Sequence, residues 1–130
     1  MGFEKVKRLS KGYVQLYTGD GKGKTTAALG LALRASGRGL HTYIGQFMKG
    51  QRYGELEALR DHPFITLEQY GDPRCIRREE VTKEHVAHAR RGLDRAREAM
   101  LCGDYDLIVL DEVNISIWFG LLTTEEVMAF

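Results

Sequence analysis

The sequence predicts an α/β fold in which helices cover both faces of a parallel sheet. First, strand-like and helix-like segments alternate along the chain of 130 residues. Second, a glycine-rich loop separates the first predicted strand from the first predicted helix. Third, an unbroken apolar run ends in the acidic pair Asp111-Glu112. Segments that alternate in this way form parallel sheets with right-handed crossovers, whose ligands bind at the carboxyl ends of the strands.

The first half of the chain contains two predicted strands and a helix between them. Residues 12–17 are expected to form the first strand, with Val14 and Leu16 on one face. Residues 24–36 are expected to form a helix with a narrow apolar face, and glycines follow its end. Residues 41–47 are expected to form the second strand. The narrow face of the helix comprises Ala27, Ala28, Leu31 and Ala35.

The second half of the chain continues the alternation. A short helix over residues 54–61 leads to a third strand over 64–70, whose alternation is weak. Residues 81–101 are expected to form the longest helix, with apolar residues at three- and four-residue spacing. Residues 107–110 are all apolar, which is typical of a central parallel strand buried on both faces. The apolar face of the long helix comprises Val86, Ala89, Leu93, Ala96 and Met100.

The composition is that of one globular domain, with 43% hydrophobic and 28% charged residues. The net charge of +1 gives no reason to expect a nucleic acid or a membrane as a partner. No apolar run approaches the length that spans a bilayer. The two cysteines, Cys75 and Cys102, lack a metal-binding spacing, so we expect reduced thiols and a cytoplasmic protein.

The segment from Thr18 to Thr26 ends in the Gly-Lys-Thr signature of a phosphate-binding loop, with a predicted strand before it and a helix after it. Backbone N–H groups of such a loop and of the helix N-terminus bind the phosphates of a nucleotide. Lys24 is expected to reach the terminal phosphates and Thr25 to ligate magnesium. The predicted fold is therefore a P-loop NTPase-like (RecA-like) three-layer domain. The predicted nucleotide-binding residues are Thr18, Gly19, Asp20, Gly21, Lys22, Gly23, Lys24, Thr25 and Thr26.

The loop departs from the common motif in two ways. Its first glycine, Gly19, stands one place later than the motif requires, and an extra lysine, Lys22, lies inside the loop. A flexible basic turn without a ligand is the alternative interpretation. The order of strand, loop and helix favours the phosphate site.

The acidic pair Asp111-Glu112 is expected to complete the nucleotide site. The loop and the acidic pair each follow a strand, so a parallel sheet brings them to the same crevice. Thr25, Asp111 and Glu112 are the predicted ligands of Mg²⁺ or Mn²⁺. The alternative is an acidic pair that only solvates the turn after the strand.

Other polar residues have simpler interpretations. His85 and His88 lie three residues apart on the long helix beside Glu84, but no further ligand is placed to complete a metal site. Most arginines are expected on a solvated helix face, while Arg77 or Arg78 could instead clamp a phosphate from a loop.

The residues from Thr18 to Ala28, with Gly30 to Ala35 and Gly37, resemble the ATP:corrinoid adenosyltransferases, whose loop carries the same late glycine and extra lysine. Gln46 to Gly50 resembles the end of the second strand in that family. The segment from Val109 to Glu112 and the helix start at Thr124 also resemble it. The resemblance covers nearly the entire chain.

The resemblance implies transfer of the 5′-deoxyadenosyl group of ATP to the cobalt of a reduced corrinoid, with release of tripolyphosphate. It implies that Lys22, Lys24 and Glu112 act on the departing triphosphate, and that ATP, Mg²⁺ or Mn²⁺ and the corrinoid bind. It leaves a homodimer and a flavoprotein reductant open as partners. We expect a basic arm over residues 1–11 and a nucleotide-binding domain over residues 12–130.

Two features depart from the family pattern. Family members carry Phe and Trp after the third strand, but the segment from Gly71 to Arg78 has no aromatic residue. Tyr70, Trp118 and Phe119 are the residues left to form an apolar wall for the corrinoid. The family continues through further strands beyond a helix that begins here at Thr123 or Thr124, so we expect the domain to be incomplete at its C-terminus.

Two other functions remain open from the sequence. One is a RecA-like ATPase that hydrolyses ATP to ADP with Glu112 activating water, although Lys22 has no role in that reaction. The other is a non-catalytic module that binds ATP or a corrinoid.

Overall fold

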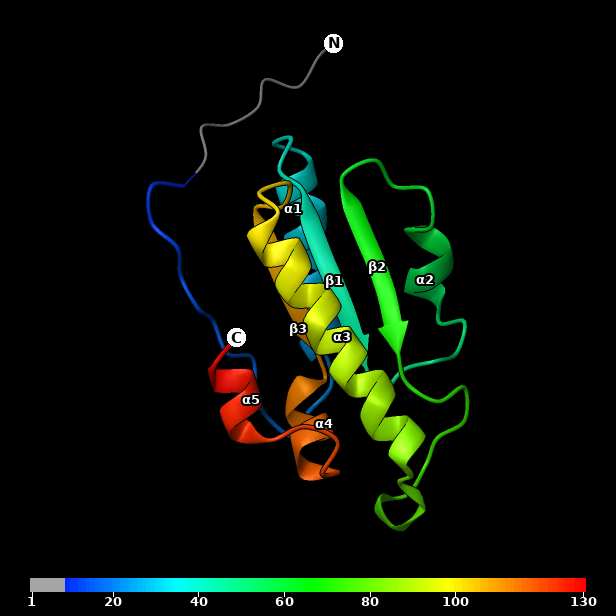
Figure 1. The fold of residues 1–130 in the computed structure, drawn as a ribbon. Helices are drawn as coiled ribbons and strands as arrows, with labels where there is room; N and C mark the ends of the chain where they lie inside the picture. The colour runs from blue at the N-terminus through cyan, green and yellow to red at the C-terminus, as the bar shows by residue number, and fades with distance from the viewer. Residues whose placement is uncertain (1–8) are drawn as a thin grey trace.

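The computed structural model describes residues 9–130, so residues 1–8 of the expected basic arm lie outside the described part. The fold is built on a parallel sheet of three strands in the order β2-β1-β3 (Figure 1). Strand β1 spans Thr42–Phe47, β2 spans Ile65–Tyr70 and β3 spans Leu107–Asp111. All three strands therefore end at the same edge of the sheet.

Two helices cover the sheet. Helix α1 spans Lys24–Ser36, and α3 spans Lys83–Leu101 on the other face (Figure 1). The smaller helices connect or follow the strands, with α4 and α5 near the carboxyl ends of the strands. Their bounds are Gly54–Ala58 for α2, Arg78–Glu80 for the 3-10 helix η1, Val113–Trp118 for α4 and Thr124–Met128 for α5.

The alternation of side chains along β1 divides the core into two layers. Tyr43 is buried against Ala96 and Ala99 of α3. Ile44, the next residue, packs with Ala32 of α1 on the opposite face. Successive strand residues point to opposite faces, so each face of the central strand needs its own helix. This arrangement confirms the predicted parallel α/β fold with helices on both faces.

The predicted strand over residues 12–17 is wrong for this structure, because the segment is extended without strand pairing and is exposed. Val14 is fully exposed, and Leu16 is 71% exposed. An alternating pattern indicates which residues are able to pair, but it does not show whether the segment reaches the edge of a partner strand. As a result β3 is an edge strand with partly buried residues, and not the central strand that its apolar run predicted.

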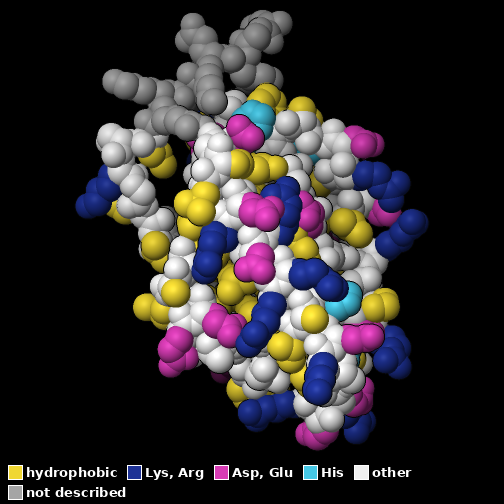
Figure 2. All heavy atoms as spheres, in the orientation of Figure 1, with side chains coloured by type: hydrophobic (Ala, Val, Ile, Leu, Met, Phe, Trp, Pro, Cys, Tyr) yellow, Lys and Arg dark blue, Asp and Glu magenta, His cyan; other side chains and the backbone are white. Residues whose placement is uncertain are grey.

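The predicted helix over 24–36 is confirmed residue for residue. In α3, Ala89, Leu93 and Ala96 are buried as predicted, but Met100 is 37% exposed and Ala99 occupies the core position. The outer face of α3 carries basic and acidic side chains interspersed with one another (Figure 2). This mixture is typical of a solvated helix face, as expected for most of the arginines.

Candidate functional site

The loop before α1 has the backbone conformation that its glycines permit. Gly19 has φ 141° and Gly23, the N-cap of α1, has φ 109°. Residues with a Cβ rarely adopt these values, so the glycines are required for this path. Within the described chain no side chain caps α1, which leaves the first-turn N–H groups available for an anion.

Lys24 turns back toward its own loop. Its Nζ donates to the carbonyl oxygens of Gly19 and Gly21, at 2.7 Å in both cases. Lys24 is exposed, so rotation of its side chain toward a phosphate requires no movement of the core. The lysine therefore holds the loop closed on itself while remaining free to change partners.

Thr25, at the start of α1, contacts Asp111 at the end of β3. The Thr25 hydroxyl lies 2.9 Å from Oδ1 and 3.1 Å from Oδ2 of Asp111, although 86 residues separate the two in sequence. The parallel sheet thus brings the loop and the acidic strand end together, as the sequence predicts.

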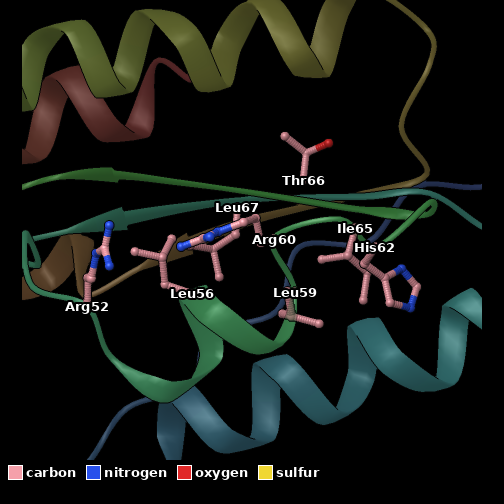
Figure 3. Close-up of a pocket in the computed structure, with 8 residues that line it drawn as sticks. All are labelled: Arg52, Leu56, Leu59, Arg60, His62, Ile65, Thr66 and Leu67. Atoms are coloured by element: carbon pink, nitrogen blue, oxygen red, sulfur yellow. The ribbon is translucent and has the colours of Figure 1, made fainter.

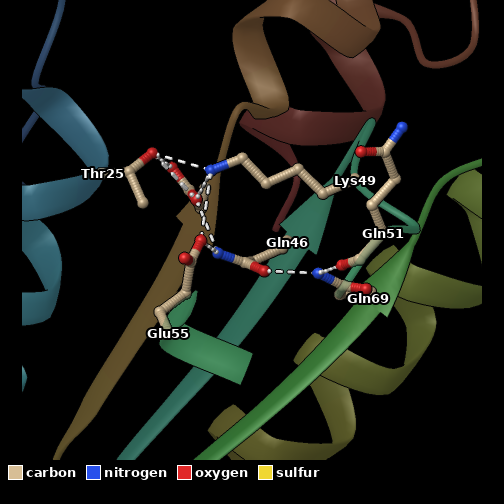
Figure 4. A network of polar contacts seen from close by, with 7 residues as sticks. Thr25, Gln46, Lys49, Gln51, Glu55 and Gln69 are labelled. Atoms are coloured by element: carbon tan, nitrogen blue, oxygen red, sulfur yellow. Dashed lines mark hydrogen bonds and ion pairs between the residues drawn. The ribbon is translucent and has the colours of Figure 1, made fainter. Parts of the chain in front are cut away.

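A row of polar side chains crosses the sheet beside this contact (Figure 4). Gln46 of β1 is paired in register with Gln69 of β2 and with Asp111 of β3. Nε2 of Gln69 donates to Oε1 of Gln46 at 3.0 Å, and Nε2 of Gln46 donates to Oδ2 of Asp111 at 3.2 Å. Gln46 also donates to Glu55 of α2 at 3.0 Å. The row fixes the orientation of the Asp111 carboxylate.

Lys49, just after β1, is part of the site, although the sequence assigned it no role. Its Nζ lies 2.9 Å from Oγ1 of Thr25 and 2.9 Å from Oδ2 of Asp111 (Figure 4). A third oxygen, Oε1 of Glu55, is 3.9 Å away. The Lys49 side chain is only 12% exposed, and that of Asp111 only 7%. The ion pair is therefore largely removed from water.

The signal for these additional residues was present in the sequence. Gln46, Lys49 and Gln69 are polar residues at or just after the carboxyl ends of strands, where a parallel sheet places its ligand site. Glu55 lies in α2, and its position in the sequence does not indicate a site residue. Its contacts with Gln46 and Lys49 depend on how the loop after β1 folds back toward the sheet.

Glu112, the second residue of the acidic pair, has a different environment. It is exposed and has φ 61°, an uncommon value for a residue with a side chain. Desolvation raises the pKa of its carboxyl above the ordinary value, and the charges of Lys49 and Lys24 oppose that shift. Met48, next to Lys49, is the other described non-glycine residue with positive φ, at 63°. Both strained positions thus lie beside the Thr25–Asp111–Lys49 contact, as is common at functional sites.

The oxygen atoms at this contact suit a magnesium ion. Adjacent ligands of octahedral Mg²⁺ lie about 3 Å apart, because each is about 2.1 Å from the metal. The 2.9 Å and 3.1 Å separations between Thr25 Oγ1 and the Asp111 oxygens match that spacing. No group of three His, Cys, Asp or Glu side chains able to hold a metal occurs in residues 9–130. A hydroxyl and a carboxylate suffice for Mg²⁺, which takes its remaining ligands from phosphates and water.

Among the other predicted site residues, Thr18, Asp20 and Lys22 lie in the loop before α1, and Thr26 lies in the first turn of α1. Thr18, Asp20, Lys22 and Thr26 are exposed.

In residues 9–130, no ring contact joins Tyr70 to Trp118 or Phe119. The Tyr70 ring contacts Phe47 at a centroid distance of 5.9 Å, and its hydroxyl donates to Glu68 on the α3 side of the sheet. Trp118 and Phe119 do contact each other, with their ring centroids 5.2 Å apart. The predicted wall therefore reduces to the two residues at the end of α4.

Arg78 and His85 have structural partners. The Arg78 guanidinium lies 4.8 Å from the centre of the Trp118 ring. His85 accepts the backbone N–H of Thr82 at the start of α3, and its other ring nitrogen contacts Asp72 at 2.9 Å. His85 thus caps α3, and its ring nitrogens already have protein partners.

A pocket of about 390 Å³ lies between α2 and β2 (Figure 3), and neither Thr25 nor Asp111 is among the residues that line it. Arg52, Leu56, Arg60 and Leu67 are among its lining residues. The polar contact of Thr25 with Asp111 lies where the phosphate-binding loop meets the end of β3. We assign the candidate site to this contact and not to the pocket.

Comparisons with known proteins extend these observations. The sequence model of the family described as ATP:corrinoid adenosyltransferase BtuR/CobO/CobP matches residues 10–130. The chain is 34% identical to the corrinoid adenosyltransferase CobA of Salmonella typhimurium, over 92% of this chain and 60% of that protein. It is 33% identical to the corrinoid adenosyltransferase of Escherichia coli K12, over 91% of this chain and 60% of the relative. An uncharacterized protein of Nostoc is 35% identical over 90% of this chain and 35% of its own length.

The fold and the loop define an α/β protein consistent with the P-loop class. The chain belongs to the ATP:corrinoid adenosyltransferase family. It spans about three fifths or less of the length of these three relatives. Across the described residues, 9–130, no helix combines the length and the apolar character needed to cross a membrane.

Proposed function

We propose that this chain transfers the 5′-deoxyadenosyl group of ATP to the cobalt of a reduced corrinoid and releases tripolyphosphate. The family membership supports the reaction class, and two relatives are named corrinoid adenosyltransferases. The contact between Thr25 and Asp111 carries the proposal, because it joins the phosphate loop to the acidic strand end in one polar site.

The reaction needs a site that stabilises a leaving group. The electron pair of cobalt(I) forms the new bond to C5′ of ATP, and the electrons of the breaking C5′–O bond leave on the triphosphate oxygen. The nucleophile has no proton to lose, so the protein need not supply a general base. Its tasks are to orient the sugar carbon and to stabilise negative charge on the triphosphate.

The residues of the site suit those tasks. The loop from Thr18 to Gly23 and the N-terminus of α1 offer backbone N–H groups to the phosphates. Lys24 and Lys22 would add positive charge once Lys24 releases the carbonyl oxygens of Gly19 and Gly21. Thr25 and Asp111 would hold Mg²⁺ or Mn²⁺, with Glu112 nearby, and the bound metal would help neutralise the triphosphate.

The proposal also assigns the parts of the chain, the corrinoid side of the site and the partners. We assign the nucleotide-binding domain to residues 12–130 and a basic arm to residues 1–11. Trp118 and Phe119 are the residues we assign to the corrinoid side, since Tyr70 faces α3. We propose a cytoplasmic location from the two cysteines, which lack a metal-binding spacing, and a homodimer and a flavoprotein reductant as partners from the family resemblance.

The deciding experiment identifies the phosphate product. The protein is incubated with ATP, Mg²⁺ and chemically reduced corrinoid in the dark. Intact tripolyphosphate with a light-sensitive alkyl corrinoid is the expected result. Orthophosphate and ADP, formed whether or not corrinoid is present, would instead identify an ATPase.

A matched pair of variants tests whether the reaction takes place at the phosphate-binding loop. Lys24→Ala removes the loop ammonium, whereas Lys83→Ala removes an exposed lysine at the start of α3. The first is expected to abolish product and the second to leave it unchanged. ATP binding without either product would favour the non-catalytic module.

A further inference from the structure

Lys49 occupies the place between the oxygen atoms that a metal ion would need. Its ammonium is 2.9 Å from both Thr25 Oγ1 and Asp111 Oδ2, the two groups proposed as metal ligands. Among residues 9–130, no other lysine or arginine is recorded within ion-pair distance of Asp111. Lys49 therefore supplies the positive charge at this junction when nothing else is bound.

An ammonium and a divalent ion exclude each other at this position. Lys49 already contacts Oδ2 of Asp111 and Oγ1 of Thr25, so a metal ion on these oxygens would lie close to the ammonium, and their like charges repel strongly over such a short distance in a site shielded from water. The side-chain exposures of 12% for Lys49 and 7% for Asp111 show that solvent screens this interaction little. Metal binding thus requires the ammonium to leave.

A bound triphosphate offers the displaced ammonium more negative charge than the nearby carboxylates of Glu55 and Glu112. Glu55 is already at 3.9 Å and accepts a hydrogen bond from Gln46, so it offers only a partial replacement for Asp111. A triphosphate bound at the start of α1 would lie beside Thr25, the residue that Lys49 contacts. The lysine side chain is flexible and carries three donors, which suits a change of partner.

We propose that Lys49 is a displaceable internal cation, which holds Thr25 and Asp111 in the free protein and moves onto the triphosphate when metal and nucleotide bind. This inference rests on the proposed function, because it needs a triphosphate at the loop. Lys49 then makes the free protein a poor binder of metal alone and a good binder of the metal with its triphosphate.

The test separates binding of metal from binding of polyphosphate. Lys49→Met removes the charge and keeps most of the side-chain volume, and Lys83→Met is the matched control at an exposed position. Mn²⁺ binding to the nucleotide-free proteins is measured by electron paramagnetic resonance. Tripolyphosphate binding is then measured by titration calorimetry on the Mn²⁺-saturated proteins at fixed ionic strength, because this is the state in which the proposal places Lys49 on the triphosphate.

The two affinities are expected to move in opposite directions in Lys49→Met. Tripolyphosphate binding should weaken roughly 10- to 100-fold, the effect of losing one charge-assisted hydrogen bond. Mn²⁺ binding should become at least several-fold tighter, because the Asp111 carboxylate no longer has a competing cation. Unchanged tripolyphosphate affinity, or weaker binding of both ligands, would overturn the inference.

A second measurement uses the unaltered protein and does not depend on the folding of a variant. Amine-reactive labelling of Lys49, followed by mass spectrometry, should increase when Mg²⁺ alone is added to saturation, while Lys83 stays unchanged. No increase at Lys49 would contradict displacement. If the unaltered protein fails to bind tripolyphosphate, the proposed function fails, and the labelling result still decides whether metal displaces Lys49.

Discussion

The hydroxyl of Thr25 and the carboxylate of Asp111 lie 2.9 Å apart, and the ammonium of Lys49 contacts both. This triad joins the first turn of α1, the end of β1 and the end of β3. Each residue reaches the junction because parallel strands end at one edge of the sheet. The same three side chains are therefore expected to contribute both to the stability of the fold and to the proposed chemistry.

Asp111→Asn is expected to destabilise the fold, because it leaves the ammonium of Lys49 buried without its carboxylate. Breaking a buried ion pair by removing one partner costs about 3–5 kcal/mol, and the nearby Glu55 should keep the loss toward the lower value. The free energy of unfolding from urea titration measures the effect. Adding Lys49→Met should recover part of it, and strictly additive effects would show that the pair is not coupled.

Lys24→Ala is expected to weaken tripolyphosphate binding roughly 10- to 100-fold without changing stability much. The ammonium contacts only exposed loop carbonyls in the free protein, so its removal leaves the core intact. Titration calorimetry measures the affinity and thermal unfolding measures the stability. A variant that binds tripolyphosphate normally would place the phosphates away from Lys24.

Gly92→Ala is expected to destabilise the protein by about 1–3 kcal/mol through overpacking. A Cβ at Gly92 would lie 2.6 Å from Cγ of the Tyr70 ring, whose position is fixed by the sheet. Gly30→Ala is the control, since Gly30 is also in a helix and a Cβ there meets nothing within 4 Å. The control should be more stable by up to about 1 kcal/mol, because alanine favours helix. Equal changes in urea unfolding would refute the packing argument.

Tyr43→Phe is expected to change the alkaline stability of the protein. Burial is the main cause that raises the pKa of Tyr43 from 10.0 to about 12. The native state therefore favours the neutral phenol, and this contribution is complete below pH 10 and declines as the pH rises toward 12. The difference in unfolding free energy between the two proteins should be constant below pH 10 and shrink above it. A constant difference up to pH 12 would show that Tyr43 titrates normally in the fold.

The sequence predicted the parallel architecture and the approach of the loop to Asp111, because both follow from the order of strands and helices. The helix at 24–36 was well defined, since its residues favour helix and glycines bound it on both sides. The strand over 12–17 was wrong because pairing depends on distant backbone that local alternation does not describe. Lys49 was missed as a site residue although it follows a strand end, because the sequence does not show which rotamer its side chain adopts or that it reaches Thr25.

The backbone around Lys49 is tightly constrained, and this limits how the site is able to respond to a ligand. The N–H of Gly71 donates to the Lys49 carbonyl at 3.0 Å, and a Cβ on Gly71 would lie 2.3 Å from the Met48 carbonyl carbon. A Cβ on Gly50 would likewise lie 2.5 Å from the Gly71 carbonyl oxygen. The segments after β1 and β2 are interlocked, so neither shifts without the other. If the proposed nucleotide binds at this junction, we therefore expect rotation of lysine side chains to accommodate it, while the main chain after β1 and β2 keeps its path.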